Sequence, residues 1–426
     1  MTAITIPYKF IPRQYQLPLF KAFDEGYKRM LVVWHRRAGK DLSIINLLMK
    51  GAIKRVGAYY YFFPTYKQGK KILWKGMTGE GRRFLDYIPE RLVYKKNETD
   101  MSVELVNGSV IQIIGTDNID SIVGTNPVGC VFSEYSLQNP KAWDFMRPVL
   151  SENGGWAVFN YTPRGKNHGY DLYEYAKENK KWFVSLLTVD ITKAISKEVI
   201  DEERESGMSE DLILQEYYCS FEGSIDGAYY SKQFKKIESE SRIIETDIYD
   251  PNLKVFTFWD LGVSDSTCIW FVQIYKDEYR IIDFYENEGE GMLHYIDHCM
   301  NSRYKGNFGK WFAPHDIKVR EFTSGESRID TARKHGVIFD IAPNIPIQDG
   351  IESVRRTLLK CYFSKKHCKN GINALKSYHK EYDDKKKIFK NRPEHDWSSH
   401  ASDAFRYFSV TVNKINKKQS DMIDIF

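Results

Sequence analysis

A basic, glycine-containing loop is the first segment of the sequence whose residue types could do chemistry. Residues 34–41 read WHRRAGKD and directly follow a short apolar run. The segment has the length of a phosphate-binding loop, GxxxxGKS/T, whose backbone N–H groups and lysine hold phosphate oxygens. It departs from that pattern at both ends, because Trp34 replaces the first glycine and Asp41 replaces the serine or threonine. Gly39 and Lys40 remain, and we expect Lys40 to reach the phosphates of a nucleotide.

The same loop carries two further cations, Arg36 and Arg37, which would lie beside a transferring phosphoryl group. Ala38 completes the loop before the glycine. Taken alone, a basic turn between a strand and a helix is more often an ordinary turn without a ligand. The loop therefore indicates a nucleotide site only if a second part of that site is present elsewhere in the chain.

An acidic residue after an apolar strand supplies that second part. Residues 128–132 are apolar and are followed by Ser133 and Glu134. In P-loop ATPases the corresponding strand normally ends in Asp-Glu, where the aspartate helps to hold magnesium and the glutamate polarises the attacking water. Glu134 is therefore a candidate catalytic residue. Since Ser133 and Asp41 have exchanged residue types relative to that pattern, we hypothesise that they compensate and keep one carboxylate and one hydroxyl around magnesium.

Three aspartates in the second half of the chain could hold metal ions. Asp260 ends an apolar run that precedes a glycine and a second apolar run, which is how RNase H-like nucleases begin. Such enzymes use carboxylates to hold two metal ions about 4 Å apart. Asp316 follows another predicted strand, and Asp403 lies one helical turn after His400. Each aspartate alone could be a cap or turn residue, but the three together favour a metal site.

In the first half of the chain, predicted strands and helices alternate. These elements must position the basic loop and the acidic residue that follows the strand. This order predicts a mainly parallel sheet covered by helices. The dipeptide Asn107-Gly108 between two short apolar runs also predicts a hairpin. Apolar strands are expected at residues 30–34, 58–63, 128–132 and 156–161, and a helix at residues 40–50.

The second half of the chain has its own series of strands and helices, so both halves belong to the α/β fold class. We expect a first domain over residues 1–225, with a helical region from about residue 190. A polar linker is expected over residues 226–250, and a second domain over residues 251–426. In that domain strands are predicted at residues 255–259, 267–274, 279–285 and 310–313, and helices at 328–335, 351–361 and 399–412.

The composition excludes several classes of protein. Of the 426 residues, 42% are hydrophobic and 15% aromatic, which excludes wholesale disorder. No apolar run approaches the roughly 18 residues of a membrane span, and nothing near the first residues predicts a secretory signal. The 6 cysteines include no CxxC pair, which favours reduced thiols over a disulfide framework. The net charge of +5 does not by itself indicate nucleic acid.

Taken together, these motifs resemble those of phage terminase large subunits over most of the chain. RRAGK at residues 36–40 is similar to the variant phosphate loop of that family, and TPRG at residues 162–165 is similar to its coupling motif. PRQYQ at residues 12–16 resembles the motif on the adenine side of the nucleotide, which implies that Gln16 contacts the base. The resemblance further implies that Thr162 links the state of the γ-phosphate to movement of the parts that grip DNA.

Two further motifs resemble the nuclease domain of that family: PHD at residues 314–316 and HDWSSHASDAFRY at residues 395–407. The resemblance implies that Asp260, Asp316 and Asp403 are metal ligands. It also implies that His400 and Asp396 orient ligands or water, although Asp396 could equally be the N-cap of the last helix. The metal ligands implied for the whole chain are Asp41, Asp260, Asp316 and Asp403.

The resemblance implies a viral DNA-packaging motor. An N-terminal P-loop ATPase domain would hydrolyse ATP with Mg²⁺ to move double-stranded DNA into a procapsid. A C-terminal RNase H-like domain would be a two-metal endonuclease that cuts concatemeric DNA, with Mn²⁺ able to substitute for Mg²⁺. The implied partners are double-stranded DNA, the portal protein, the small terminase subunit and further copies of the chain in a ring. The implied location is the host cytoplasm, with transient docking on the procapsid and no membrane contact.

Two stretches, residues 66–75 and 385–392, interleave lysine or arginine with aromatic residues. Such stretches can hold phosphates and stack on bases, or they can be solvated basic faces. The second stretch lies between turn-prone segments, and we interpret residues 385–390 as a basic hairpin tip that meets the DNA backbone.

Two other interpretations of the whole chain stay open. A helicase-like, DNA-dependent ATPase could carry an inactive RNase H-like domain as a DNA clamp, and ATPase activity without metal-dependent cutting would support it. A non-enzymatic interaction protein with degenerate sites is the third interpretation, and only Trp34, Asp41 and Ser133 favour it.

Overall fold

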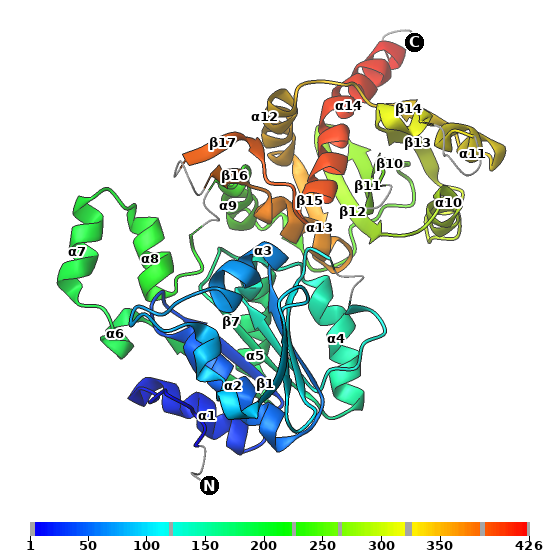
Figure 1. The fold of residues 1–426 in the computed structure, drawn as a ribbon. Coiled ribbons are helices and arrows are strands. Elements are labelled where there is room, and N and C mark those ends of the chain that lie inside the picture. The colour runs from blue at the N-terminus through cyan, green and yellow to red at the C-terminus, as the bar shows by residue number, and fades with distance from the viewer. Residues whose placement is uncertain are drawn as a thin grey trace. The chain divides into compact units, whose positions relative to one another are not determined.

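The computed structural model describes residues 5–118, 122–223, 227–262, 266–319, 326–383 and 388–423. The chain divides into two units, residues 1–224 and 225–426 (Figure 1). Each unit is built around its own sheet, with helices on its faces. The predicted α/β fold class is therefore confirmed in both halves of the chain.

The first sheet is mainly parallel, as the alternation of strands and helices predicts. Its order is β3-β4-β5-β2-β6-β7-β1-β8, and only β3-β4 and β4-β5 pair in antiparallel fashion. The antiparallel β4-β5 pair is the hairpin predicted at Asn107-Gly108, where Gly108 has a φ of +86°. The strands are β1 (Arg29–Trp34), β2 (Ala58–Phe63), β3 (Val93–Asn97), β4 (Ser102–Leu105), β5 (Val110–Gly115), β6 (Gly129–Ser133), β7 (Trp156–Tyr161) and β8 (Trp182–Leu187).

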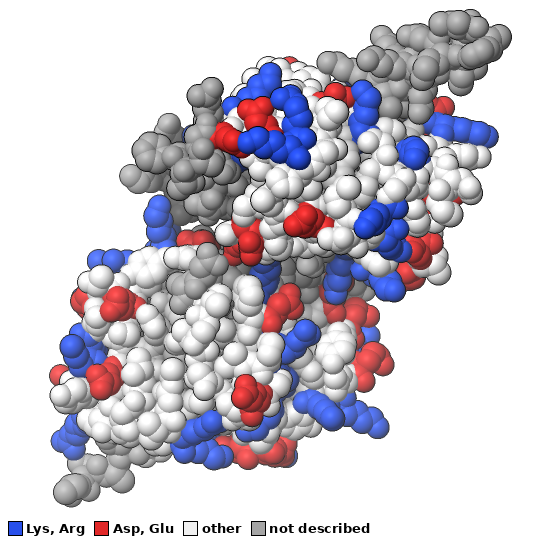
Figure 2. Space-filling model, turned by 90° about the vertical axis from the view of Figure 1, so that its right-hand side faces the viewer, with Lys and Arg blue, Asp and Glu red and all other residues white. Residues whose placement is uncertain are grey.

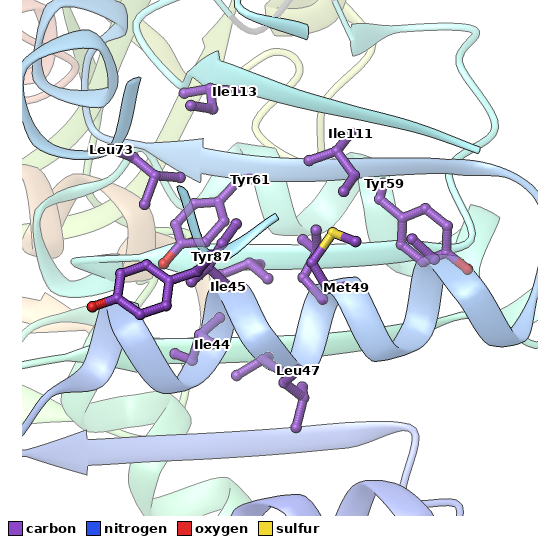
Figure 3. Close-up of a cluster of buried hydrophobic side chains, with 14 of the residues drawn as sticks. Ile44, Ile45, Leu47, Met49, Tyr59, Tyr61, Leu73, Tyr87, Ile111 and Ile113 are labelled. Carbon is purple, nitrogen blue, oxygen red and sulfur yellow. The ribbon is translucent and has the colours of Figure 1, made fainter. Parts of the chain in front are cut away.

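Helices cover both faces of this sheet because alternate residues of each buried strand point to opposite sides. Tyr59 and Tyr61 of β2 pack with α2 on one face, and Tyr60 and Phe62 pack with α4 and α5 on the other. Figure 3 shows the first of these clusters, with α2 lying along the sheet. The helices are α1 (Leu17–Asp24), α2 (Lys40–Lys54), α3 (Tyr66–Gly69), α4 (Lys141–Glu152), α5 (His168–Glu178), α6 (Val189–Thr192), α7 (Lys197–Glu205) and α8 (Glu210–Tyr218).

The basic, aromatic stretch at residues 66–75 is partly a core segment. It forms α3 and a π-helical turn at Lys70–Trp74, and the side chains of Leu73 and Trp74 are buried. The indole of Trp74 donates a hydrogen bond to Glu98 at 2.6 Å. Since Trp74 packs in the core, it is not available to stack on a base, and the prediction of stacking fails for this residue.

The second sheet is mixed, with antiparallel and parallel strand pairs. Its order is β14-β13-β10-β11-β12-β15-β9, in which β10, β11 and β12 are antiparallel and β13 and β14 are parallel to β10. Helices α9, α12, α13 and α14 pack on one face, and α10 and α11 on the other. The strands are β9 (Ile243–Ile244), β10 (Val255–Asp260), β11 (Thr267–Tyr275), β12 (Glu278–Asn287), β13 (Phe308–Ala313), β14 (Phe339–Ile341) and β15 (Cys361–Ser364).

Residues 226–250, expected to be a linker, contribute two elements to the second unit. Phe234 and Ile237 of α9 are buried in its core, and β9 pairs with β15 at the edge of its sheet. The helix predicted over residues 351–361 also differs, because it ends at Leu358 and Cys361 begins a strand. The helices are α9 (Ser231–Ser239), α10 (Met292–Met300), α11 (Arg328–Lys334), α12 (Ile347–Leu358), α13 (Lys365–Ser377) and α14 (Ser399–Ile423).

A two-stranded hairpin, β16 (Lys380–Asp383) and β17 (Ile388–Pro393), precedes α14. This agrees with the hairpin interpreted from the basic stretch, but most of its tip, residues 384–387, lies outside the described residues. Figure 2 shows basic and acidic side chains interspersed on one face of the protein, in keeping with 62 basic and 57 acidic residues. No helix of the described chain is both long and apolar enough to cross a membrane.

Candidate functional site

The parallel order of the first sheet brings the predicted nucleotide residues to one edge. Strands β6, β7 and β1 are neighbours, and β7 lies between the strand of the basic loop and the strand of the acid. Because the carboxyl ends of parallel strands meet at the same edge, the residues that follow them lie close together. Lys40, Ser133 and Thr162 therefore converge from three separate segments.

The loop after β1 forms a turn that ends in the first residue of α2. Gly39 has a φ of +81°, a left-handed conformation that glycine adopts without steric cost. Lys40 is buried, and its ammonium donates hydrogen bonds to the carbonyl oxygens of Trp34 (3.0 Å) and His35 (3.3 Å). A third bond goes to the hydroxyl oxygen of Thr162 at 2.9 Å. In this structure Lys40 thus connects its own loop to the segment that follows β7.

Asp41 and Ser133, whose exchanged residue types suggested a pair, are in direct contact. The Ser133 hydroxyl donates to Oδ1 of Asp41 at 3.0 Å. Tyr61 also donates to Oδ1 at 3.0 Å, and the Asn160 amide donates to the Ser133 hydroxyl oxygen at 3.2 Å. Sequence analysis missed Tyr61 and Asn160. The amide of Asn160 within the apolar strand β7 is a signal that could have found it, whereas Tyr61 is one of several aromatic residues in β2.

Glu134 lies directly after β6, in a left-handed conformation with a φ of +54°. Its Oε2 atom is buried and accepts no hydrogen bond from the described part of the chain. Burial raises the pKa of this carboxyl group, and the nearby cations of Lys40 and Arg164 act in the opposite direction. A buried carboxylate oxygen without a donor is suited to accept a proton from, or orient, a water molecule.

Glu216 contacts two arginines of the site, Arg36 and Arg164. It is a buried residue on α8 that was not predicted from the sequence. Its carboxylate forms an ion pair with Arg164 and lies 3.9 Å from the guanidinium of Arg36. The backbone carbonyl of Glu216 also accepts a hydrogen bond from the Arg36 N–H at 2.7 Å. The Arg37 side chain is exposed beside the loop, and Ala38 is buried beneath it.

Gln16 contacts the loop that follows β1. Its side chain is buried, and its amide nitrogen donates to the carbonyl of Ala38 at 2.9 Å. Its amide oxygen accepts from the backbone N–H of Arg13 at 2.8 Å. In this structure the side chain therefore fixes the position of the loop, and the predicted contact with a base stays a prediction.

In the second unit, Asp260 and His400 meet at the end of β10. Nδ1 of His400 lies 3.2 Å from Oδ2 of Asp260. Burial is the largest cause that raises the pKa of Asp260, while the hydrogen bond to His400 lowers it. The negative charges of Asp403 and Asp316 raise this pKa further.

The other two predicted ligands, Asp316 and Asp403, differ in their hydrogen bonding. Asp316 lies in the turn His315–Lys318 after β13, and its Oδ1 atom is buried without a hydrogen-bond partner in the described residues. Asp403 on α14 accepts two hydrogen bonds from Arg406, at 3.2 and 3.0 Å. No three histidine, cysteine or acidic side chains of the described chain converge closely enough to hold a metal ion. The donor set suits a hard divalent cation, although Oδ1 of Asp403 is already held by Arg406.

Asp396 caps the start of α14. Its Oδ1 atom accepts hydrogen bonds from the backbone N–H of Ser398 at 2.9 Å and from the Ser398 hydroxyl at 2.6 Å. The structure therefore supports the capping interpretation of this residue.

The two units define a two-domain α/β protein, with a mainly parallel sheet that carries the basic loop and a mixed sheet that carries Asp260 and His400. No family model matches the chain. The terminase large subunit of Escherichia phage T5 is 24% identical over 419 residues, which cover 95% of this chain and 91% of that protein. The chain is thus similar to a phage terminase large subunit over nearly its whole length, and the resemblance predicted from the motifs is confirmed.

Solved structures of three phage proteins also align with the chain. The large terminase of a thermophilic bacteriophage, in complex with ADP, is 17% identical and covers 93% of this chain and 98% of its own, with a TM-score of 0.41. The large terminase ATPase domain of Thermus phage P74-26 is 17% identical and covers 51% and 99%, with a TM-score of 0.42. The Mn-bound large terminase nuclease domain of bacteriophage SPP1 is 18% identical and covers 40% and 95%, with a TM-score of 0.32.

Proposed function

We propose that the chain is a viral DNA-packaging motor. ATP hydrolysis in the first unit drives double-stranded DNA into a procapsid, and the second unit is a metal-dependent endonuclease that cuts concatemeric DNA. The observation that carries the proposal is the meeting of Lys40, Asp41, Ser133 and Thr162 at the carboxyl edge of one parallel sheet. The similarity to the phage T5 terminase large subunit over 95% of the chain supports the same function.

In the first unit, each residue has a role that follows from its position. Lys40 turns from the carbonyls of its own loop to the β- and γ-phosphates, and Arg36 and Arg37 add positive charge beside the transferring group. Glu134 accepts a proton from the attacking water, and its raised pKa, caused by burial, suits a general base. Thr162 senses whether Lys40 is engaged with the phosphates.

Asp41 and Ser133 are the residues that would hold magnesium, as one carboxylate and one hydroxyl. Their hydrogen bond of 3.0 Å supports the idea that the two exchanged residues form one site. Magnesium, when bound with the nucleotide, neutralises phosphate charge and helps to orient the phosphates.

In the second unit, Asp260, Asp316 and Asp403 would hold two metal ions. The unpartnered, buried Oδ1 atom of Asp316 supports this assignment, because such an atom is costly unless a ligand satisfies it. His400 fixes the orientation of Asp260 through its hydrogen bond. Two metal ions, when bound, activate water and stabilise the leaving 3′ oxygen; Mg²⁺ is the expected ion and Mn²⁺ can replace it.

The proposed partners are double-stranded DNA, the portal protein of the procapsid, the small terminase subunit and further copies of this chain in a ring. The proposed location is the host cytoplasm, with transient docking on the procapsid. These assignments rest on the similarity to a phage terminase large subunit.

Translocation can be tested directly by displacement of a third DNA strand bound to a linear duplex. The Asp260→Asn variant should displace that strand when ATP is present, since the duplex stays uncut. The Asp260→Asn, Glu134→Gln double variant should not, because it cannot hydrolyse ATP. ATP hydrolysis without displacement would contradict the motor.

One observation favours the helicase-like alternative: the cation of Arg406 donates two hydrogen bonds to Asp403, one of the three proposed metal ligands. If the second unit is only a DNA clamp, the protein should separate the strands of a duplex with ATP and should cut no DNA with Mg²⁺ or Mn²⁺. Metal-dependent cutting that Asp260→Asn abolishes would exclude this alternative.

A further inference from the structure

A tyrosine in the middle of the first sheet is bonded to the proposed magnesium ligand. Tyr61 lies on β2 and its side chain is fully buried, yet its hydroxyl reaches the first turn of α2. There it donates a hydrogen bond to Oδ1 of Asp41 at 3.0 Å. The Ser133 hydroxyl donates to the same oxygen at the same distance.

The directions of these bonds follow from the neighbouring Asn160. Its side-chain amide donates to the Ser133 hydroxyl oxygen at 3.2 Å, so the Ser133 hydrogen is available for Asp41. Oδ1 of Asp41 thus receives donors from two different strands. Oδ2 accepts no hydrogen bond from the described residues. The Asp41 side chain is half-buried, so this second oxygen is accessible to a cation.

A carboxylate at this position needs such support more than the usual hydroxyl does. The Asp41 side chain has one more rotatable bond than serine, and it must present one particular oxygen to a metal ion. Partners that orient a metal-binding carboxylate commonly change metal affinity 10- to 100-fold when they are removed. The loop has gained a carboxylate, and the sheet beneath it supplies two hydroxyl donors that fix it.

We propose that Tyr61 is a positioning residue that orients Asp41 for magnesium, and that it determines how much magnesium strengthens nucleotide binding. This inference rests on the proposed nucleotide site. It assigns Tyr61 no contact with the nucleotide.

The chain offers a matched control on the same strand. Tyr59 is also fully buried on β2, but its hydroxyl donates to the carbonyls of Gly51 (2.9 Å) and Arg55 (2.6 Å) at the other end of α2. Figure 3 shows the two hydroxyl groups near opposite ends of this helix. Tyr61→Phe and Tyr59→Phe therefore each remove one buried hydroxyl from the same face of the sheet, and only the first removes a bond to Asp41.

The test is the dissociation constant of a fluorescent ATP analogue, measured in Mg²⁺ and in EDTA for the full chain. The constant in EDTA reports that the loop is folded and binds phosphates, and the ratio of the two constants reports the gain from magnesium. We expect Tyr61→Phe to keep the wild-type constant in EDTA within about twofold and to lose about tenfold of the gain. Tyr59→Phe should keep the wild-type gain.

Four results would overturn the inference. If Tyr61→Phe keeps the full gain from magnesium, or if Tyr59→Phe loses as much, Tyr61 has no specific role in orienting Asp41. If the wild type itself shows no gain, the assignment of magnesium to Asp41 fails and the inference fails with it. If the wild type binds no nucleotide even in EDTA, the nucleotide site itself is wrong, and so is the inference.

Discussion

The ammonium group of Lys40 lies 2.9 Å from the hydroxyl oxygen of Thr162 and donates a hydrogen bond to it. The two residues belong to segments that follow neighbouring parallel strands, β1 and β7. Lys40 is also held by two carbonyl groups of its own loop, so nucleotide phosphates must compete for it with all three acceptors. We therefore expect a bound nucleotide to release Thr162, which would give the segment after β7 a direct signal that the site is filled.

Replacing Thr162 with valine removes this signal while keeping the shape of the side chain. We expect Thr162→Val to lower the free energy of unfolding by about 1.5–3 kcal/mol, because its hydrogen bond with the charged Lys40 is lost. Stimulation of ATP hydrolysis by DNA should also disappear. Thr116→Val is the control, since among the described residues its buried hydroxyl bonds to the carbonyls of Phe63 and Pro64 and not to a charged group. ATPase assays with and without DNA measure the effect, and unchanged stimulation in Thr162→Val would contradict it.

The contact between Asp41 and Ser133 predicts that their residue types can be exchanged. Asp41→Ser should abolish ATP turnover, because it leaves two hydroxyls and no carboxylate for magnesium. The double variant with Ser133→Asp should regain about tenfold in rate over Asp41→Ser, a difference of about 1.4 kcal/mol in activation free energy. The single variant Ser133→Asp completes the double-mutant cycle. It places two carboxylates together. No recovery in the double variant would contradict compensation between Asp41 and Ser133.

The parts of this site that could be predicted are those encoded in short, local patterns. The strands at residues 30–34 and 128–132 are predicted from hydrophobicity and length alone, and parallel pairing then brings their ends together. Tyr61 and Glu216 could not be predicted in the same way. Their functional contacts join segments 20 and 52 or more positions apart, and they depend on how α2 and α8 dock on the sheet.

The boundary between the units is harder to predict than the strands. Residues 226–250 look like a linker because polar residues dominate, yet the apolar residues Phe234 and Ile237 recur at helical spacing and are buried. The sequence alone places Cys361 at the end of a helix because the apolar run continues past Leu358. Only the pairing of β15 with β12 shows that this run changes from helix to strand.

We expect Arg406 to compete with a metal ion for Asp403. Its guanidinium donates two hydrogen bonds to Oδ1, and its side chain packs tightly against Gly350 of α12. We expect Arg406→Gln to bind Mn²⁺ about three- to tenfold more tightly, as expected for loss of an ion pair worth about 1 kcal/mol. Arg406→Lys should bind Mn²⁺ like the wild type, because it keeps the positive charge. Isothermal titration with Mn²⁺ measures both, and weaker binding by Arg406→Gln would show that Arg406 supports the metal site instead.

His35 makes the stability of the first unit depend on pH. The ring is fully buried, and Nδ1 must donate to the Arg36 carbonyl at 2.6 Å because a carbonyl can only accept. Nε2 then accepts from the Thr192 hydroxyl at 2.6 Å. Burial lowers the pKa of His35 to about 4, so the unfolded chain binds a proton more readily than the folded one. Its contribution to stability is therefore complete above pH 6.5 and is lost as the pH falls toward 4.

The expected loss is up to about 3 kcal/mol between pH 6.5 and pH 4. His35→Asn keeps a donor for the Arg36 carbonyl and cannot titrate in this range. The difference in unfolding free energy between the wild type and His35→Asn should therefore shrink as the pH falls, as measured by urea denaturation at pH 7.5, 6 and 5. A difference that stays constant across this range would contradict the low pKa.

The central claim is that one chain carries two separate catalytic sites, and two variants assayed side by side test it most directly. Each protein is assayed for ATP hydrolysis and for plasmid cleavage with Mn²⁺ or Mg²⁺. We expect the wild type to do both, Glu134→Gln to cut DNA without hydrolysing ATP, and Asp260→Asn to hydrolyse ATP without cutting DNA. Absence of cutting by the wild type, or cutting by Asp260→Asn at the wild-type rate, would contradict the account.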